Sequence, residues 1–395
     1  MKRTVLSSIL VLLGSITCGN VMATPKQLTI ATFNVSMESE NYQPKGPLGP
    51  HVLVKELQSG TNQQIRNIAA IVQKTAPDII LLNEFDYIKD PQQGVQAFLK
   101  NYLAVSQHGQ PVQHYPYFYY NTVNTGQPSG FDLNNDGNID TAREDAWGFG
   151  QYPGHYGMVL LSKYPIDHAK IRTFQHFKWK DMPGYLATKK ADASPWYSEA
   201  AWQQMPLSSK SHWDVPVLIG DETLHVLVSH PTPPVFDGPE DRNGHRNHDE
   251  VRFWVDYISG KSDYIYDDQG QRGGLAQGAR FVVLGDLNSS AVEGDAFRDA
   301  IAALSQHPLI IHQPIPASVG GAKHSPNNPH AKHHTAGWRM RADYVLPSEQ
   351  GFKLLNNGVF WPAAGEPLAD LVQSRGATSD HRLVFATLEI VPLRQ

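Results

Sequence analysis

The sequence contains a single cysteine, Cys18, among its 395 residues. This residue lies in the N-terminal leader described below, so the mature chain is expected to contain no thiol. A disulfide framework, a thiolate metal site and a cysteine nucleophile are therefore excluded. Core packing must hold the fold together, and a chain of this length can do so. Any metal must be bound by oxygen or imidazole ligands, which favour Mg²⁺, Ca²⁺, Mn²⁺ or Zn²⁺.

A strong net charge is also absent, since the formal net charge at pH 7 is -5. No global attraction to nucleic acid or to an anionic membrane follows from this charge, although a local basic patch remains compatible with it. The apolar run near the N-terminus, VLSSILVLLGSIT, is too short and too mixed for a stable membrane span.

This apolar run follows the basic segment MKR and precedes the small-residue site VMA. That order predicts a secretory signal peptide over residues 1–23, cleaved after Ala23. The alternative is a lipoprotein acylated on Cys18, but the preceding SIT is a poor match for a lipobox. We therefore expect a secreted or periplasmic protein.

Strands and helices are predicted to alternate along one domain. Apolar, β-branched segments predict strands at residues 27–37, 78–86, 115–121, 156–166, 224–231, 279–288, 341–347 and 379–390. Helical periodicity predicts helices at 62–77, 94–105, 249–258 and 295–304. A Gly/Pro-rich loop is expected at 42–50, and long insertions at about 121–156, 174–213, 231–248 and 318–337. This alternation is typical of an α/β architecture.

Polar residues of similar kinds stand near the ends of these strands. In FVVLGDLNSS, Asp286 and Asn288 are two residues apart and would project from one face. An Asx turn explains a single such ending. The pattern recurs, however, at Asn34, Glu84, His230, Asp343, Asp380 and His381. We therefore expect the strand ends to converge on an acidic pocket that a divalent cation neutralises.

Seven segments occur in the order typical of one superfamily: TFNV, PDIILLNE, GMVLLSKYPI, VSHPTPP, VVLGDLN, RADYVLPS and SDHRLV. The chain resembles the endonuclease/exonuclease/phosphatase superfamily of DNase I-like, metal-dependent phosphoesterases. The resemblance spans Asn34 to Val384. It implies an α/β (α+β) fold, a four-layer αββα sandwich of two packed mixed β-sheets flanked by helices.

The resemblance also implies roles for individual residues. Glu84 would bind the active-site Mg²⁺ or Mn²⁺, with Asn34 beside it and Asp380 completing the metal shell. One position departs from the pattern: some relatives carry an aspartate two residues after the asparagine, where this chain has Ser36. The number of metal ions is therefore left open.

The implied catalytic group contains five further residues. His381 would be the essential histidine and Asp343 its orienting carboxylate. Asp286 would orient or deprotonate the attacking water, Asn288 would donate a hydrogen bond to the scissile phosphate, and His230 would contact that phosphate. The sequence leaves open whether Asp286 or His381 accepts the proton of the water.

Residues 132–140, DLNNDGNID, resemble a calcium-binding loop. The twelfth position of such a loop is usually acidic but is Arg143 here. A structural Ca²⁺ site is predicted, with a polar surface loop as the alternative. The candidate ligands are Asp132, Asn134, Asp136, Asn138 and Asp140.

The proline-rich segment 231–248 is predicted to be a loop over the pocket. Arg242, His245 and Arg246 are its candidate phosphate-binding residues, the alternative being a solvated loop. The histidine cluster at 324–334 is expected to be an exposed loop without a metal, the alternative being a second metal site. Tryptophans of the 174–213 insertion are interpreted as core residues, although they could also stack on bases or contact lipid.

The predicted function is a secreted, divalent-metal-dependent phosphoesterase that cleaves phosphodiesters by in-line attack of water. An extracellular nuclease acting on DNA or RNA is the preferred hypothesis, although the sequence supports the reaction class better than the substrate. The alternatives are a phospholipid or sphingomyelin phosphodiesterase, a phosphate-scavenging phosphatase, and a catalytically silent binding module. A monomer without a stable protein partner is expected.

Overall fold

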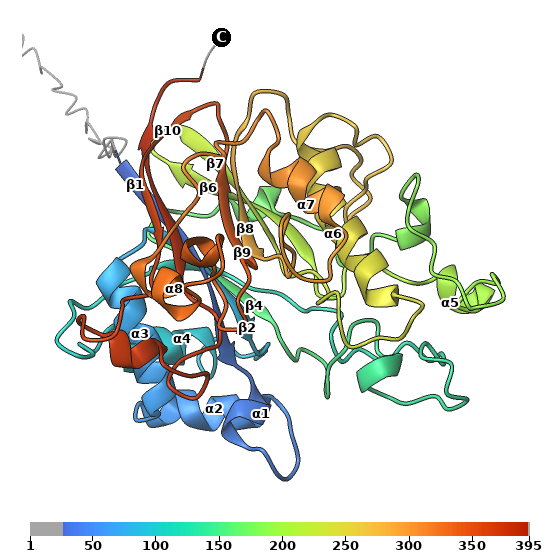
Figure 1. The fold of residues 1–395 in the computed structure, drawn as a ribbon, viewed down its shortest axis with the longest axis horizontal. Coiled ribbons are helices and arrows are strands. Elements are labelled where there is room, and N and C mark those ends of the chain that lie inside the picture. The colour runs from blue at the N-terminus through green and yellow to red at the C-terminus, as the bar shows by residue number, and fades with distance from the viewer. Residues whose placement is uncertain (1–26, 394–395) are drawn as a thin grey trace, which may run out of the picture.

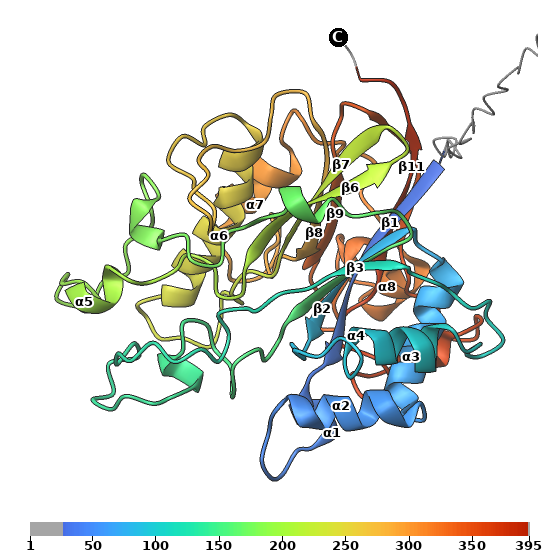
Figure 2. The same cartoon turned by 180° about the vertical axis from the view of Figure 1, so that it is seen from behind.

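Two mixed β-sheets pack face to face in the computed structural model, which describes residues 27–393. The predicted signal peptide, with Cys18, lies outside the described residues. Helices α2, α3 and α4 cover the outer face of one sheet, and α6 and α7 cover that of the other (Figures 1 and 2). The predicted four-layer arrangement is therefore confirmed. Within residues 27–393, no helix has the length and apolar character needed to span a membrane.

The strands form a six-stranded and a five-stranded sheet. The order in the first is β10 (Phe352–Val359), β11 (Val384–Ile390), β1 (Gln27–Met37), β2 (Ile79–Phe85), β4 (Met158–Ser162) and β3 (Tyr117–Tyr119). The order in the second is β5 (Arg172–Thr173), β6 (His212–Ile219), β7 (Glu222–Ser229), β8 (Arg280–Asp286) and β9 (Asp343–Pro347). The pairs β1–β2 and β7–β8 are parallel, and the other pairs are antiparallel.

The helices lie in the connections between the strands, and most of them are short. They are α1 (Ser39–Tyr42), α2 (Pro50–Ser59), α3 (Gln63–Thr75), α4 (Val95–Phe98), α5 (Glu199–Trp202), α6 (Arg242–Ile258), α7 (Arg298–Ser305) and α8 (Val319–His324). A π-helical turn, Leu99–Leu103, continues α4. Short 3₁₀ turns lie at Arg143–Asp145, His168–Lys170, Trp179–Asp181, Ala331–His333 and Ala369–Val372.

The core has two layers, which follow the period-two alternation of strand side chains. In β8, Val282 and Leu284 pack between the sheets, whereas Val283 points to the helix side. On that side it belongs to the same cluster as Trp254 of α6 and Ile301 of α7. Burial on both faces explains why β8 has an uninterrupted apolar sequence.

Several predicted boundaries were wrong. Helix α2 was missed, although Pro50 at its first turn and the buried Val52, Leu53 and Leu57 fit a helix start. Strand β6 was missed: its first two residues were assigned to the 174–213 insertion and the others to no element, and Pro216 interrupts the strand pattern there. The polar sequence of β10 hid that strand as well.

Segment 231–248 is not a loop throughout, since α6 begins at Arg242 rather than near residue 249. The prolines of this segment all precede the helix, so they do not interrupt it. The histidine segment also contains ordered turns, and His334 is buried beside Glu293 rather than exposed. Among the tryptophans, Trp179 and Trp213 are fully buried, as expected of core residues.

The polar residues converge at one edge of the sandwich, but not all of them follow strands. Asp343 is the first residue of β9, and His381 precedes β11. Because β9 runs antiparallel to β8, its start lies beside the end of β8, with Asp343 opposite Asp286. The prediction that all these residues stand at carboxyl ends was therefore wrong, although the convergence itself is observed.

Candidate active site

The ends of β1 and β2 hold the first pair of site residues. The two strands are in register at Asn34 and Asn83, and a bulge then separates that pair from Met37 and Phe85. Glu84 lies in this bulge with a left-handed φ of 56°. Non-glycine residues adopt this conformation at a cost of about 1–3 kcal/mol, and bulges often redirect a side chain. The bulge therefore explains how Glu84 is directed toward the site.

Asp286, at the end of β8, is held by groups from the opposite sheet. Asn34 Nδ2 donates to its Oδ2 at 3.1 Å, and its own backbone N–H donates to Asn83 Oδ1 at 3.2 Å. Asn288 N donates to Oδ1 at 3.0 Å. These contacts fix the carboxylate in place and join the two sheets at the site.

The close approach of β8 to β7 explains why position 285, the first of the GDLN segment, is a glycine. Its φ is 154°, and a Cβ at this position would lie 2.1 Å from the carbonyl oxygen of Ser229. Only glycine allows the end of β8 to approach β7 so closely. The end of β7 leads directly to His230, so this approach places His230 beside Asp286.

Asp343 and His381 form the second part of the site. His381 Nδ1 lies 2.9 Å from Asp343 Oδ2 and 3.1 Å from Oδ1. Thr335 Oγ1 donates to Oδ2 at 2.6 Å and accepts the backbone N–H groups of Ala342 and Asp343. These contacts provide the geometry that Asp343 needs in order to orient the His381 ring, as predicted.

The charges of the site interact strongly because the side chains are buried. Burial alone would lower the pKa of His381, but the carboxylates of Asp343 and Asp286 raise it to about 10. Burial raises the pKa of Asp286 to about 7, against the opposing effect of the His381 charge. His381 Nε2 and Asp286 Oδ2 lie 3.5 Å apart. At neutral pH, His381 therefore carries the proton of this pair.

His230 is the uncharged histidine of the site. Its Nε2 lies 3.5 Å from Asp286 Oδ2, and its pKa is lowered well below the ordinary value by burial and by the charges of Lys210 and His381. Its Nδ1 is buried and has no hydrogen-bond partner among residues 27–393. Nε2 is therefore the ring nitrogen beside the carboxylate, and Nδ1, on the other side of the ring, is a buried polar atom without a partner.

The carboxylates fit a divalent cation. Burial raises the pKa of Glu84, and the nearby charge of Asp380 raises it further. The ligand atoms of Glu84, His230 and Asp286 lie within 4.8 Å of one another, as do those of Asp286, Asp343 and His381. Carboxylate and amide oxygens suit Mg²⁺ or Mn²⁺, and such an ion would offset the repulsion between the acids.

Asp380 lies at the margin of this cluster. Its Oδ1 accepts a hydrogen bond from Ser36 Oγ at 3.4 Å, and its Oδ2 lies 3.7 Å from Arg375 Nη1. Its charge influences the pKa of both Glu84 and His381. It belongs to neither of the two compact ligand groups among the described residues. Its role as a metal ligand therefore stays a prediction.

The three predicted phosphate-binding residues occupy different surroundings on α6. Arg242 pairs with Glu240 and with Glu144, at 3.2 Å from the latter. Arg246 is buried, and its guanidinium donates to the carbonyls of Leu207 and Pro206. His245 stacks on Phe297 and lies 3.2 Å from Thr188 Oγ1. Each of them thus already has a structural partner within the chain.

The predicted calcium loop is exposed and stabilised by its own hydrogen bonds. Asp132 accepts the backbone N–H groups of Asp136 and Gly137. The buried Asp145 accepts those of Leu133 and Asp140, at 2.7 and 2.8 Å. Three of the predicted ligands are carboxylates, and they do not form a compact group among the described residues. Calcium binding stays a prediction.

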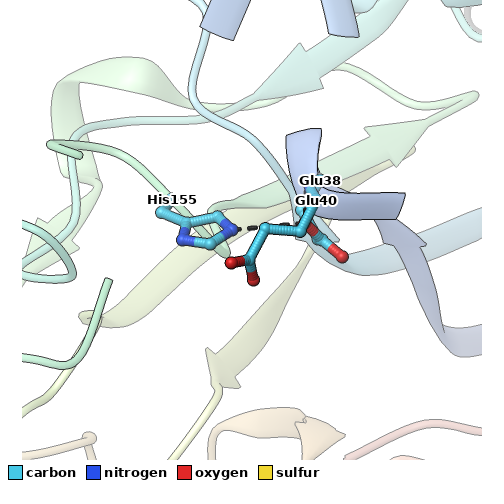
Figure 3. Close-up of side chains that lie close together, drawn as sticks. All are labelled: Glu38, Glu40 and His155. Atoms are coloured by element: carbon cyan, nitrogen blue, oxygen red, sulfur yellow. Dashed lines mark hydrogen bonds and ion pairs between the residues drawn. The ribbon is translucent and has the colours of Figure 1, made fainter. Parts of the chain in front are cut away.

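Figure 3 shows a third compact group of acidic and imidazole side chains: Glu38, Glu40 and His155. Arg375 pairs with both Glu38 of this group and Asp380 of the site. His155 Nδ1 accepts the backbone N–H of Gln151 at 3.1 Å. The ring proton therefore resides on Nε2, which lies 3.3 Å from Glu38 Oε2. Because Nε2 has no lone pair to offer, this group is a buried hydrogen-bonded pair rather than a metal site. The sequence analysis missed it.

Other residues of the site also escaped the sequence analysis. Asn83 and Thr335 position Asp286 and Asp343, and Lys210 is a buried cation whose charge reaches Asp286 and His230. Asn83 could have been found from its place beside Glu84 in the strand. Neither Thr335 nor Lys210 follows a recognisable strand or motif.

The Endonuclease/Exonuclease/phosphatase family matches residues 31–381. The chain belongs to this family. Its members are hydrolases that act on phosphoester bonds and are generally dependent on a divalent metal ion. The resemblance drawn from the sequence segments is confirmed. No curated protein sequence matches the chain.

Solved structures share the fold at low sequence identity. An endonuclease/exonuclease/phosphatase from Beutenbergia cavernae DSM 12333 is 15% identical, with 93% of this chain and 73% of that chain covered and a TM-score of 0.50. Sphingomyelinase C from Streptomyces griseocarneus is 16% identical, covering 91% and 99%, with a TM-score of 0.43. The human Nocturnin catalytic domain is 12% identical, covering 93% and 95%, with a TM-score of 0.42. At these identities the comparison with the first structure shows the fold alone.

Proposed function

We propose that this family member is a divalent-metal-dependent phosphodiesterase in which Asp286 activates the attacking water. The observation that carries the proposal is the buried network joining Asn34, Asp286, Asp343 and His381 across both sheets. A bound divalent cation would polarise the phosphoryl oxygen and offset the negative charge of the acids. The residues that would hold it are Glu84 and Asn34, and Asp380 is the further candidate.

The protonation states of Asp286 and His381 favour Asp286 as the general base. His381 is already protonated at neutral pH because its pKa is raised to about 10 by its carboxylate neighbours. It is therefore unable to take a proton from water and instead supplies positive charge to the phosphoryl oxygens in the transition state. Asp286, whose pKa burial raises to about 7, has the basicity that suits proton transfer near neutral pH.

The remaining residues position the reactants. Asn34 and Asn288 donate to different oxygens of Asp286 and so orient its carboxylate. Asn288 Nδ2 also donates to the carbonyl of Pro231 at 3.2 Å, so this amide is held beside His230. The neutral His230 would donate to a phosphate oxygen from its side of the site. No covalent intermediate is needed, and direct in-line attack by water follows.

The chain retains every catalytic residue that the resemblance implies, which argues against a silent binding module. Among macromolecular substrates, we propose nucleic acid, so that the biological role is that of a nuclease. Phospholipid hydrolysis is the alternative. Export through the predicted signal peptide, to the periplasm or the medium, is part of the same proposal.

Hydrolysis assays with the chain from Thr24 onward test the proposal. Bis(p-nitrophenyl) phosphate, plasmid DNA and sphingomyelin vesicles would each be incubated with Mg²⁺, with Mn²⁺ and with EDTA. His381→Ala is the active-site variant, and His114→Ala, an exposed histidine, is its matched control. We expect metal-dependent hydrolysis of the small diester that only His381→Ala abolishes. Absence of hydrolysis with every substrate and metal would refute the proposal.

A further inference from the structure

A pocket of about 420 Å³ opens next to the catalytic cluster. Its wall includes Thr232, two residues after His230, and Tyr156, whose pKa the charge of Glu84 helps to raise. The volume lies in the range of small-molecule sites. Most of the wall comes from the segments expected to be insertions, so the pocket is built by the parts of the chain that the catalytic cluster does not use.

Glu250 of α6 holds two walls of this pocket together. Its Oε1 accepts the backbone N–H of Ser209 and its Oε2 that of Thr232, each at 2.6 Å. The carboxylate is fully buried. These bonds extend the β6–β7 pairing beyond its last pair, His212 and Ser229. Lys210 is thereby fixed close to the residues that follow His230.

Lys210 is a buried cation without a close partner. It is 5% exposed, and its ammonium makes no hydrogen bond or ion pair with any residue in the range 27–393. Burial lowers its pKa, against the more distant charges of Glu250, Glu84 and Asp286. The Lys210 ammonium is not among the fully enclosed atoms without a partner in the described residues, so it reaches the open volume of the pocket, where an anion delivered by a ligand would pair with it.

Two hydroxyl groups of the same wall are also unsatisfied. Ser209 Oγ and Thr232 Oγ1 are buried, and neither has a hydrogen-bond partner among the described residues. Buried polar groups normally have partners, so these two hydroxyls, which reach the pocket by rotation about χ1, indicate together with the neighbouring Lys210 ammonium a ligand with acceptor oxygens. By contrast, Arg242 and Arg246 of the same pocket are already engaged by carboxylates and backbone carbonyls.

The rest of the lining limits the shape and charge of this ligand. Arg143 adds an exposed cation, and Glu144 is the one carboxylate among the lining residues within 27–393. Phe149 and Phe236 present rings that are 43% and 85% exposed. Cations among the apolar groups disfavour an acyl chain, and the limited volume disfavours a nucleic-acid duplex.

We propose that this pocket binds the part of the substrate beyond the scissile phosphate, and that this part is compact and carries a second phosphate or phosphonate-like anion. Lys210, Ser209 and Thr232 bind its oxygens, and the aromatic rim covers the organic scaffold. This inference rests on the proposed function, because it names the substrate class of the same site. The pocket thus narrows the proposed phosphodiesterase activity to small diesters that carry a further phosphate, and this substrate class takes precedence over the nuclease role proposed for macromolecular substrates.

Non-hydrolysable phosphonates provide the test. Methylphosphonate and the methylene-, ethylene- and propylene-bisphosphonates would be compared as inhibitors of bis(p-nitrophenyl) phosphate hydrolysis, with the metal ion in excess. We expect the best bisphosphonate to bind at least about tenfold more tightly than methylphosphonate, which corresponds to ~1.4 kcal/mol. Lys210→Met and, separately, Thr232→Val should reduce this ratio, whereas Lys190→Met, an exposed lysine, should preserve it.

The ratio is measured within each variant, so metal chelation by the inhibitors affects all variants alike. Equal affinity for mono- and bisphosphonates in the wild type, or a ratio that survives Lys210→Met, would overturn the pocket assignment. If the diester is not hydrolysed at all, the proposed function fails instead. The same ratios are then obtained from ligand-induced shifts in melting temperature, which need no turnover.

Discussion

Replacing Asp343 by asparagine separates the charge of this residue from its orienting role. Thr335 Oγ1 accepts two backbone N–H groups, so its hydroxyl proton is the one donated to Asp343 Oδ2. In Asp343→Asn, the amide oxygen must therefore occupy the Oδ2 position. That position is also the nearer acceptor for His381 Nδ1, at 2.9 Å against 3.1 Å. The hydrogen bond and the tautomer of His381 are preserved, and the negative charge is lost.

The magnitude follows from the pKa of His381. Its rise from 6.5 to about 10 corresponds to roughly 5 kcal/mol of net stabilisation of the imidazolium, at 1.36 kcal/mol per pKa unit. Asp343 contributes more to this rise than Asp286. We therefore expect Asp343→Asn to lower the pKa by about two units and kcat/KM by on the order of 10²-fold.

The sign of the pH dependence is fixed by the raised pKa. A histidine with a raised pKa carries its proton below that pKa and loses it as the pH rises through it. The alkaline limb of the pH–rate profile should thus move to lower pH by about two units in Asp343→Asn.

The assay combines this profile for bis(p-nitrophenyl) phosphate with NMR titration of His381, whose signal is identified by its absence in His381→Gln. Asp370→Asn, an exposed aspartate, is the matched control and should change neither measurement. An unchanged pKa of His381 in Asp343→Asn would refute the electrostatic reasoning. An unchanged pKa with a large loss of kcat would show that orientation is the larger effect.

Three further predictions concern the metal, the pocket and acid stability. Glu84→Gln should abolish the rise in melting temperature on adding Mn²⁺ while leaving the metal-free melting temperature equal or higher, because burial disfavours the carboxylate. Glu250→Gln should lower the free energy of unfolding in urea by about 3 kcal/mol, because its amide NH₂ would oppose the N–H of Ser209 or Thr232. Burial lowers the pKa of His212 to about 4, so stability should fall by up to ~3 kcal/mol as the pH drops from 6.5 to 4, and urea unfolding of His212→Gln should show a shallower loss.

The catalytic residues were predictable because they adjoin the strongest strand signals in the sequence. Asp286 follows an apolar run that is buried on both faces, and Glu84 ends a similar run in β2. Such runs are recognisable without the structure, so the polar residue that follows each run can be located from the sequence as well. An apolar run does not show whether a strand runs parallel or antiparallel to its neighbour. For this reason Asp343 was predicted at the carboxyl end of a strand, whereas it is the first residue of β9.

The pocket was not predictable for a physical reason. Lys210 lies in a segment without apolar periodicity, and its position depends on the hydrogen bond from its neighbour Ser209 to Glu250, 41 residues away along the chain. Helix α6 was expected to begin after the proline-rich segment, so Glu250 was placed in its first turn. The structure instead places this residue in the third turn, facing the sheet. Long-range contacts of this kind leave no periodic signal in a single sequence.

The catalytic geometry also depends directly on how the two sheets pack. Asp286 belongs to the five-stranded sheet, yet its carboxylate and its backbone N–H are bonded to Asn34 and Asn83 of the six-stranded sheet. A displacement of one sheet against the other would therefore break both bonds at once. Core residues such as Leu284, which pack between the sheets, set this geometry without contacting the substrate. The site is consequently a property of the interface between the sheets rather than of either sheet alone.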